Sequence, residues 1–167
     1  MWIIFIVFLL LLLISIQTTF LSLFAISGIV PDLVLIFAVY CGIKLKDSRG
    51  AYAGLISGFI QDCFSGGVLG FNTLSKSLIA YVFSHLKDKI MVEGIVPICF
   101  FLFISSVFDS TLFFCIQFLL FKNEWGEALV PAILGFSLYN AVIGPLSFWA
   151  FEECKRWFLQ KTSTEIM

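Results

Sequence analysis

Long apolar runs separated by short polar stretches follow one another along the whole chain and predict helices that cross a membrane. Crossing a hydrocarbon core of about 30 Å takes about 20 apolar residues in helical conformation. The pattern predicts six spans, at residues 2–23, 31–43, 50–63, 70–86, 94–121 and 129–151, and a polar tail at residues 152–167. The second and third spans are short, so the sequence leaves open that these two dip into the membrane and return.

Composition supports a membrane-embedded chain. Hydrophobic residues make up 60% of the sequence and charged residues 13%, which is far from the usual balance of a soluble domain. We therefore expect an all-α integral membrane protein, with a single compact bundle of about six transmembrane helices over residues 1–151. A net charge of −1 and the absence of a basic run argue against nucleic acid as a partner. No Lys or Arg precedes the first apolar run, which predicts a retained helix rather than a cleaved signal peptide.

The distribution of basic residues predicts the orientation of the chain. Eight of the ten Lys and Arg residues fall in three segments that six alternating spans place on one side: Lys44, Lys46, Arg49, Lys87, Lys89, Lys155, Arg156 and Lys161. Loops rich in Lys and Arg remain in the cytoplasm. Both termini are therefore expected in the cytoplasm.

One helix carries glycine at every fourth position. Residues four apart lie on the same face of a helix, and a ridge without side chains allows another helix to approach closely. The ridge, its terminal acid and the following turn are Gly50, Gly54, Gly58, Asp62, Gly66 and Gly70. We expect this surface to pack inside the bundle, with direct contact to another protein as the alternative.

Asp62 is the first polar group expected at membrane depth. It follows Arg49 by thirteen residues, or about 20 Å of helix, which places it below the outer interface. It also ends a helix, where the macrodipole disfavours negative charge. Lys76 or the backbone N–H groups of residues 66–70 are the expected compensation. Asp62 then either fixes the turn or contacts a partner or ligand.

Asp109 is the second such acid, near the middle of the fifth span. Together with Ser105, Ser106 and Gln117 it forms a polar stripe on an otherwise apolar helix. Such a stripe must face the bundle, where Tyr139 or Asn140 of the sixth span is expected to meet it. Interhelical hydrogen bonding is the favoured role, and an ion or proton path is the alternative.

The sequence contains no pattern of residues typical of a catalytic centre. His85 is the only histidine and lies beside a basic loop, without a paired carboxylate cluster, a nucleophile elbow or a phosphate-binding loop. We expect neither an enzyme nor a metal or cofactor site.

The chain resembles a known family over roughly residues 30 to 90. Pro31-Asp32-Leu33, the glycine helix ending in Gln61-Asp62, Ser65-Gly66 and Leu69-Gly70 are similar to the signature of MreD, the rod shape-determining membrane protein family. This resemblance implies a non-enzymatic scaffold in the bacterial cytoplasmic (inner) membrane. It would bind MreC directly and, through that complex, MreB filaments, RodA and a class B penicillin-binding transpeptidase.

MreD-like chains also resemble the substrate-binding membrane subunits of energy-coupling-factor vitamin transporters, which use six short helices. This second resemblance implies a similar bundle and an alternative function as a small-molecule-binding transporter subunit. Asp62, Asn72 and Lys76 are then candidates to line a pocket. The Ala-xxx-Ala surface of those subunits is missing, because the first span has no alanine before Ala25.

Overall fold

Six α-helices make up the fold in a computed structural model of the chain. The structure describes residues 2–19, 29–45, 49–66, 68–86, 94–122 and 129–164, with side chains from residue 8 to residue 157. The helices are α1 (Trp2–Thr19), α2 (Leu33–Lys44), α3 (Arg49–Ser65), α4 (Phe71–Leu86), α5 (Ile95–Phe121) and α6 (Leu129–Thr164). The expectation of an all-helical chain with six helices is confirmed.

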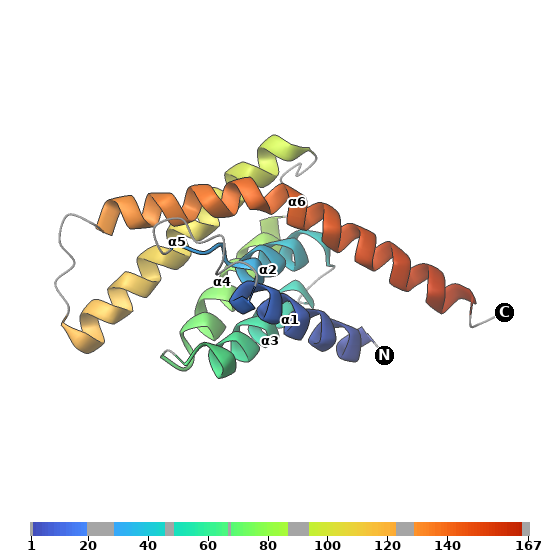
Figure 1. Ribbon diagram of the computed structural model, residues 1–167, viewed down its shortest axis with the longest axis horizontal. Helices are drawn as coiled ribbons and strands as arrows, with labels where there is room; N and C mark the ends of the chain where they lie inside the picture. The colour runs from blue at the N-terminus through green and yellow to red at the C-terminus, as the bar shows by residue number, and fades with distance from the viewer. Residues whose placement is uncertain are drawn as a thin grey trace.

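The central helix is α2, which contacts all five others (Figure 1). Every residue from Leu33 to Gly42 is buried, as expected for a helix that is apolar on all sides. Its twelve residues span only about 18 Å at 1.5 Å per residue. Because α2 is shorter than the hydrocarbon core and wholly enclosed, its neighbours rather than α2 itself face the lipid.

The helices α3 and α4 pack closely along the glycine ridge. A Cβ atom on Gly54 would lie 2.6 Å from the backbone oxygen of Lys76, and one on Gly58 would lie 2.7 Å from the Cα of Thr73. Gly50 instead approaches α2, where its Cβ would lie 2.9 Å from the Cα of Gly42. The described ridge is therefore covered by helices of the same chain.

The long helices α5 and α6 form a hairpin that extends beyond the other four (Figure 1). Among the described residues, only Ile95–Phe121 and Leu129–Trp157 are both long and apolar enough to cross a membrane unaided. Phe118, Leu119, Leu120 and Phe121 are each more than half exposed, as suits a surface that faces lipid.

The helix α6 is longer than the predicted sixth span, which ends at residue 151. It contains Pro145, and Figure 1 shows the ribbon changing direction about midway along α6. Beyond the apolar stretch the helix continues to Thr164. Glu152 accepts a hydrogen bond of 2.7 Å from the Tyr40 hydroxyl of α2 and lies 3.7 Å from the Lys155 ammonium. The Glu152–Lys155 contact is at helical spacing, and the Tyr40 hydrogen bond attaches the start of the extension to α2.

The packing of α3 on α4 predicts that even alanine is too large on the ridge. Gly54→Ala and Gly58→Ala should each destabilise the folded protein by about 1–3 kcal/mol, because the added methyl group meets the backbone of α4. Thermal unfolding in mild detergent measures the loss. Cys63→Leu adds more volume on an exposed face of the same helix and should leave the unfolding temperature unchanged. Equal stability of all three variants would contradict the close packing.

Candidate functional site

Lys76 lies at the centre of a buried charged cluster, and its side chain is only 1% exposed. Its ammonium nitrogen lies 2.9 Å from Oδ2 of Asp32 and 3.4 Å from Oδ1 of Asp109. It also donates a hydrogen bond to the Asn72 side-chain oxygen. An ammonium group has three donors, and here each has an acceptor. We call Lys76, Asp32 and Asp109 the charged cluster; it joins the middle of α4 to α5 and to the start of α2.

Asp32 both begins the central helix and neutralises Lys76. Its Oδ1 accepts hydrogen bonds of 3.0 and 3.1 Å from the backbone N–H groups of Val34 and Leu35, as an N-cap residue does. The Gln61 amide of α3 donates to both carboxylate oxygens at 3.2 Å. From the sequence, Asp32 was not expected among the candidate site residues. An acid directly before an apolar run is the signal that could have identified this cap.

The predicted polar stripe on α5 contacts two different helices. The Ser75 hydroxyl of α4 donates to Oδ1 of Asp109, which is 5% exposed. One turn earlier, Ser106 accepts a hydrogen bond of 3.0 Å from the amide of Asn140 on α6. The oxygen of the same amide accepts the backbone N–H of Asp32 at 2.8 Å. Asn140 is fully buried and therefore joins α6 to α5 and to the cap of α2.

Asp62 lies against the N-terminus of α4. Its two oxygens accept backbone N–H groups of Gly70, Asn72 and Thr73 at 2.9 to 3.0 Å. The Asn72 amide and the Thr73 hydroxyl donate to the same carboxylate at 3.0 and 2.6 Å. A helix N-terminus favours an anion through its free N–H groups and its dipole.

Two groups were expected from the sequence to compensate Asp62: Lys76 and the backbone N–H groups of residues 66–70. The structure pairs it with N–H groups of Gly70 and of the first turn of α4. The contacts of Lys76 described above go to Asp32 and Asp109 instead. The carboxylate therefore connects the end of α3 to the beginning of α4. A role for Asp62 in contact with a partner remains a prediction.

The turn between α3 and α4 depends on the backbone conformation of two glycines. Gly66 and Gly70 have φ angles of 63° and 97°, which other residues adopt only with strain. No atom lies within 4 Å of the position of a Cβ at either residue. Their environment thus differs from that of Gly50, Gly54 and Gly58, which lie against neighbouring helices.

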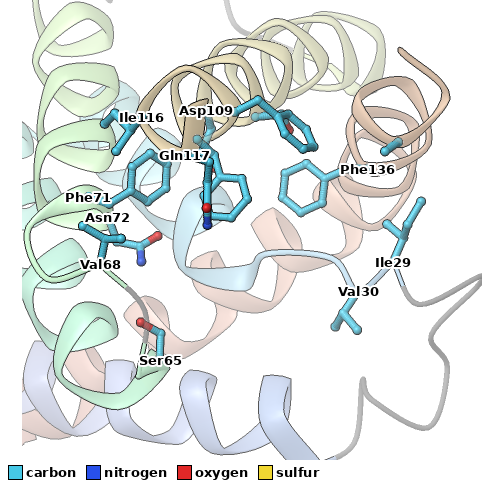
Figure 2. Close-up of a pocket in the computed structure, with 14 residues that line it drawn as sticks. Ile29, Val30, Ser65, Val68, Phe71, Asn72, Asp109, Ile116, Gln117 and Phe136 are labelled. Atoms are coloured by element: carbon cyan, nitrogen blue, oxygen red, sulfur yellow. The ribbon is translucent and has the colours of Figure 1, made fainter. Parts of the chain in front are cut away.

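A cavity of about 610 Å³ lies beside the charged cluster (Figure 2). It is bordered by the end of α3, the start of α4, the second half of α5, the first half of α6 and the segment before α2. The lining residues are Ile29, Val30, Ser65, Val68, Phe71, Asn72, Asp109, Ser110, Phe113, Phe114, Ile116, Gln117, Ala132 and Phe136. Of the three residues expected to line a pocket, only Asn72 does so; Asp62 and Lys76 lie outside the lining.

The acidic side chains of the described residues do not gather into a group that could bind a metal. No group of three His, Cys, Asp or Glu side chains in this part of the chain could hold a metal ion. The oxygens of Asp32 and Asp62 are occupied by N–H and O–H donors of the chain itself. These hydrogen bonds connect α3 to the start of α2 and to α4.

Removing the central cation should destabilise the protein strongly. Lys76→Met leaves Asp32 and Asp109 buried without their shared partner, and loss of one member of a buried ion pair costs about 3–5 kcal/mol. Thermal unfolding in detergent reports this loss. Lys122→Met, which removes an exposed charge beyond α5, is the matched control and should have little effect. Similar unfolding temperatures for both variants would contradict a structural role for the charged cluster.

Asp62 should behave as a helix cap. Asp62→Ala removes the acceptor of five hydrogen bonds and should cost about 2 kcal/mol or more, the upper end for N-caps. Asp62→Asn keeps one acceptor oxygen and should be intermediate. Hydrogen exchange of the first turn of α4 measures the effect directly. Ser65→Ala, at the end of α3, is the control. Unchanged protection in Asp62→Ala would exclude the cap.

Comparison of the chain with known proteins gives one match, to a protein family. Residues 1–154 match the family described as MreD, rod shape-determining protein MreD. No curated protein and no solved structure matches the chain. The expected likeness to the fold of energy-coupling-factor subunits therefore stays a prediction. The match extends well beyond the region where the motifs were recognised and confirms the resemblance found in the sequence. This helical membrane protein belongs to the MreD family of rod shape-determining proteins.

Proposed function

We propose that this protein is a non-enzymatic scaffold subunit of the bacterial cell-wall elongation complex, in the cytoplasmic membrane. It binds MreC directly and, within the complex, helps to couple MreB filaments to RodA and a class B penicillin-binding transpeptidase. The single observation that carries the proposal is the family match over residues 1–154.

The packing of the described helices supports a scaffold role. The buried polar side chains of α2, α4, α5 and α6 bind one another and so fix the relative positions of these helices. The α5–α6 hairpin in turn presents large apolar side chains outward, for example Leu119 at 75% and Val142 at 72% exposure. A rigid bundle with an apolar outer surface is suited to hold the membrane helix of a partner such as MreC.

The proposed orientation places both termini in the cytoplasm. The beginning of α1 and the end of α6 lie toward the same end of the molecule (Figure 1). Lys44 at the end of α2 and Arg49 at the start of α3 belong to the basic segments assigned to that side. Three further basic residues predicted on the cytoplasmic side lie outside the described residues: Lys46, Lys87 and Lys89.

The alternative function is a small-molecule-binding subunit of an energy-coupling-factor type vitamin transporter. The cavity beside α5 favours it, because its volume of about 610 Å³ is in the range of small-molecule sites. The membership in the MreD family favours the scaffold.

Purification in mild detergent, followed by identification of bound proteins, tests the proposal. We expect tagged protein to retain MreC in roughly equal amount, with RodA, the transpeptidase and MreB in smaller amounts. An unrelated six-span membrane protein carrying the same tag is the control. Recovery of no wall-elongation component, together with a retained vitamin, would overturn the scaffold in favour of the transporter subunit.

A further inference from the structure

The carboxylate of Asp109 has one oxygen without a partner, at the wall of the cavity. Its Oδ1 accepts hydrogen bonds from Ser75 and Lys76, while Oδ2 accepts none from any described residue. Asp109 lines the cavity although the residue is only 5% exposed. The side chain is otherwise buried, so this oxygen is accessible from the cavity and free to accept a hydrogen bond.

The charged cluster also contains one more acid than base. Two carboxyl groups, of Asp32 and Asp109, share one ammonium group, so one of them has no base of its own. Both oxygens of Asp32 are hydrogen-bonded, as shown above. No Lys, Arg or His is found among the described residues that line the cavity. The unmatched acid thus faces the cavity as Asp109, and an acid at membrane depth needs a counter-charge when it is ionised.

Two further polar groups at the cavity, the Ser110 hydroxyl and the Gln117 amide, have no hydrogen-bond partner among the described residues. Ser110 is 7% exposed, and its hydroxyl has no hydrogen bond among the described residues. Other buried helical serines differ, because Ser105, Ser137 and Ser147 each donate to the carbonyl four residues earlier. The Gln117 amide, two turns beyond Ser110, also lacks a partner in the described part of the chain.

Aromatic rings surround these polar groups. Phe71 and Phe136 lie on either side of Gln117 in Figure 2. Phe113 packs edge-on against Phe71 at 5.3 Å between ring centroids, and Phe114 completes the aromatic lining. Aromatic faces attract cations, most strongly where water is excluded. The same faces offer nothing to an anion.

From these observations we propose that the cavity binds an amphiphile with one ammonium group and an apolar body. The ammonium donates hydrogen bonds to Oδ2 of Asp109 and to the Ser110 hydroxyl, and the apolar body packs among Phe71, Phe113 and Phe136. A fatty acid or an isoprenoid phosphate is excluded, because its anion would meet the carboxylate of Asp109. The ammonium comes either from a free amine or from the ethanolamine headgroup of a lipid. This inference goes beyond the scaffold function and does not depend on it.

Binding of 4-phenylbutylamine to the full-length protein in detergent tests the proposal, with 4-phenylbutanol and 4-phenylbutanoate as neutral and anionic counterparts. We expect saturable binding of the amine, about tenfold or more tighter than that of the alcohol, and no saturable binding of the carboxylate. Equal binding of amine and alcohol, tighter binding of the carboxylate, or no binding of any probe would each overturn the proposal. A protonated Asp109 that binds no ammonium group would give this last result, the absence of binding by any probe.

Variants of the cavity locate the site. Asp109→Asn should remove the preference for the amine over the alcohol, provided that its unfolding temperature is unchanged. Ser110→Ala avoids the charged cluster and should weaken amine binding about fivefold through loss of one hydrogen bond. Phe136→Leu should weaken amine binding more than alcohol binding. Phe118→Leu, on the exposed surface of α5 outside the lining, is the control and should bind like the unmodified protein. Unchanged amine binding in both Ser110→Ala and Phe136→Leu would exclude this cavity.

The two sources of the ammonium group give different results in lipid. If the headgroup is the natural occupant, nanodiscs of phosphatidylethanolamine should compete with 4-phenylbutylamine, whereas nanodiscs of phosphatidylglycerol should not. If a free amine is the occupant, the affinity should be the same in both. Recovery of MreC is a separate measurement, so failure of amine binding leaves the scaffold proposal standing, and the reverse also holds.

Discussion

The position of one ammonium group, that of Lys76, determines how four of the six helices fit together. A lysine enclosed in a membrane protein is tolerated only where carboxylates lie within reach. Asp32 and Asp109 supply them from the start of α2 and the middle of α5, at 2.9 and 3.4 Å. Asn140 extends the same network to α6 through the backbone of Asp32. Because hydrogen bonds are directional, these contacts define a single arrangement where apolar packing alone would allow several.

The glycine ridge of α3 makes this arrangement sterically possible. Gly54 and Gly58 bring the backbone of α3 against that of α4, where Gly54 lies beside the backbone of Lys76. From this position of α4, the side chains of Ser75 and Lys76 reach Asp109 of α5. Asp62 then fixes the N-terminus of α4 relative to the end of α3. Small residues and buried charges are usually described as separate features of membrane proteins. In this protein the small residues of α3 allow the charged side chains to be buried.

The sequence predicts the number and type of elements well, because hydropathy and glycine spacing are local signals. The predicted second span at residues 31–43 lies close to α2 at Leu33–Lys44. Partners in the charged cluster were not predictable, since Lys76 meets residues from two helices that are distant in the chain. Gly42 was missed because it is a single glycine in an apolar run, although it faces Gly50 directly. The extension of α6 was missed because its charged residues indicate an end of the membrane span, which need not be an end of the helix.

The order of the charged residues along the chain has a consequence for biogenesis. Asp32 leaves the ribosome before Lys76, so the lysine enters the membrane with its first counter-ion already in place. Asp109 and Asn140 are synthesised later than both members of this pair. A nascent chain that has released only its first four helices therefore already contains both Lys76 and Asp32. The insertion machinery need not shelter an isolated cation while it waits for the remainder of the protein.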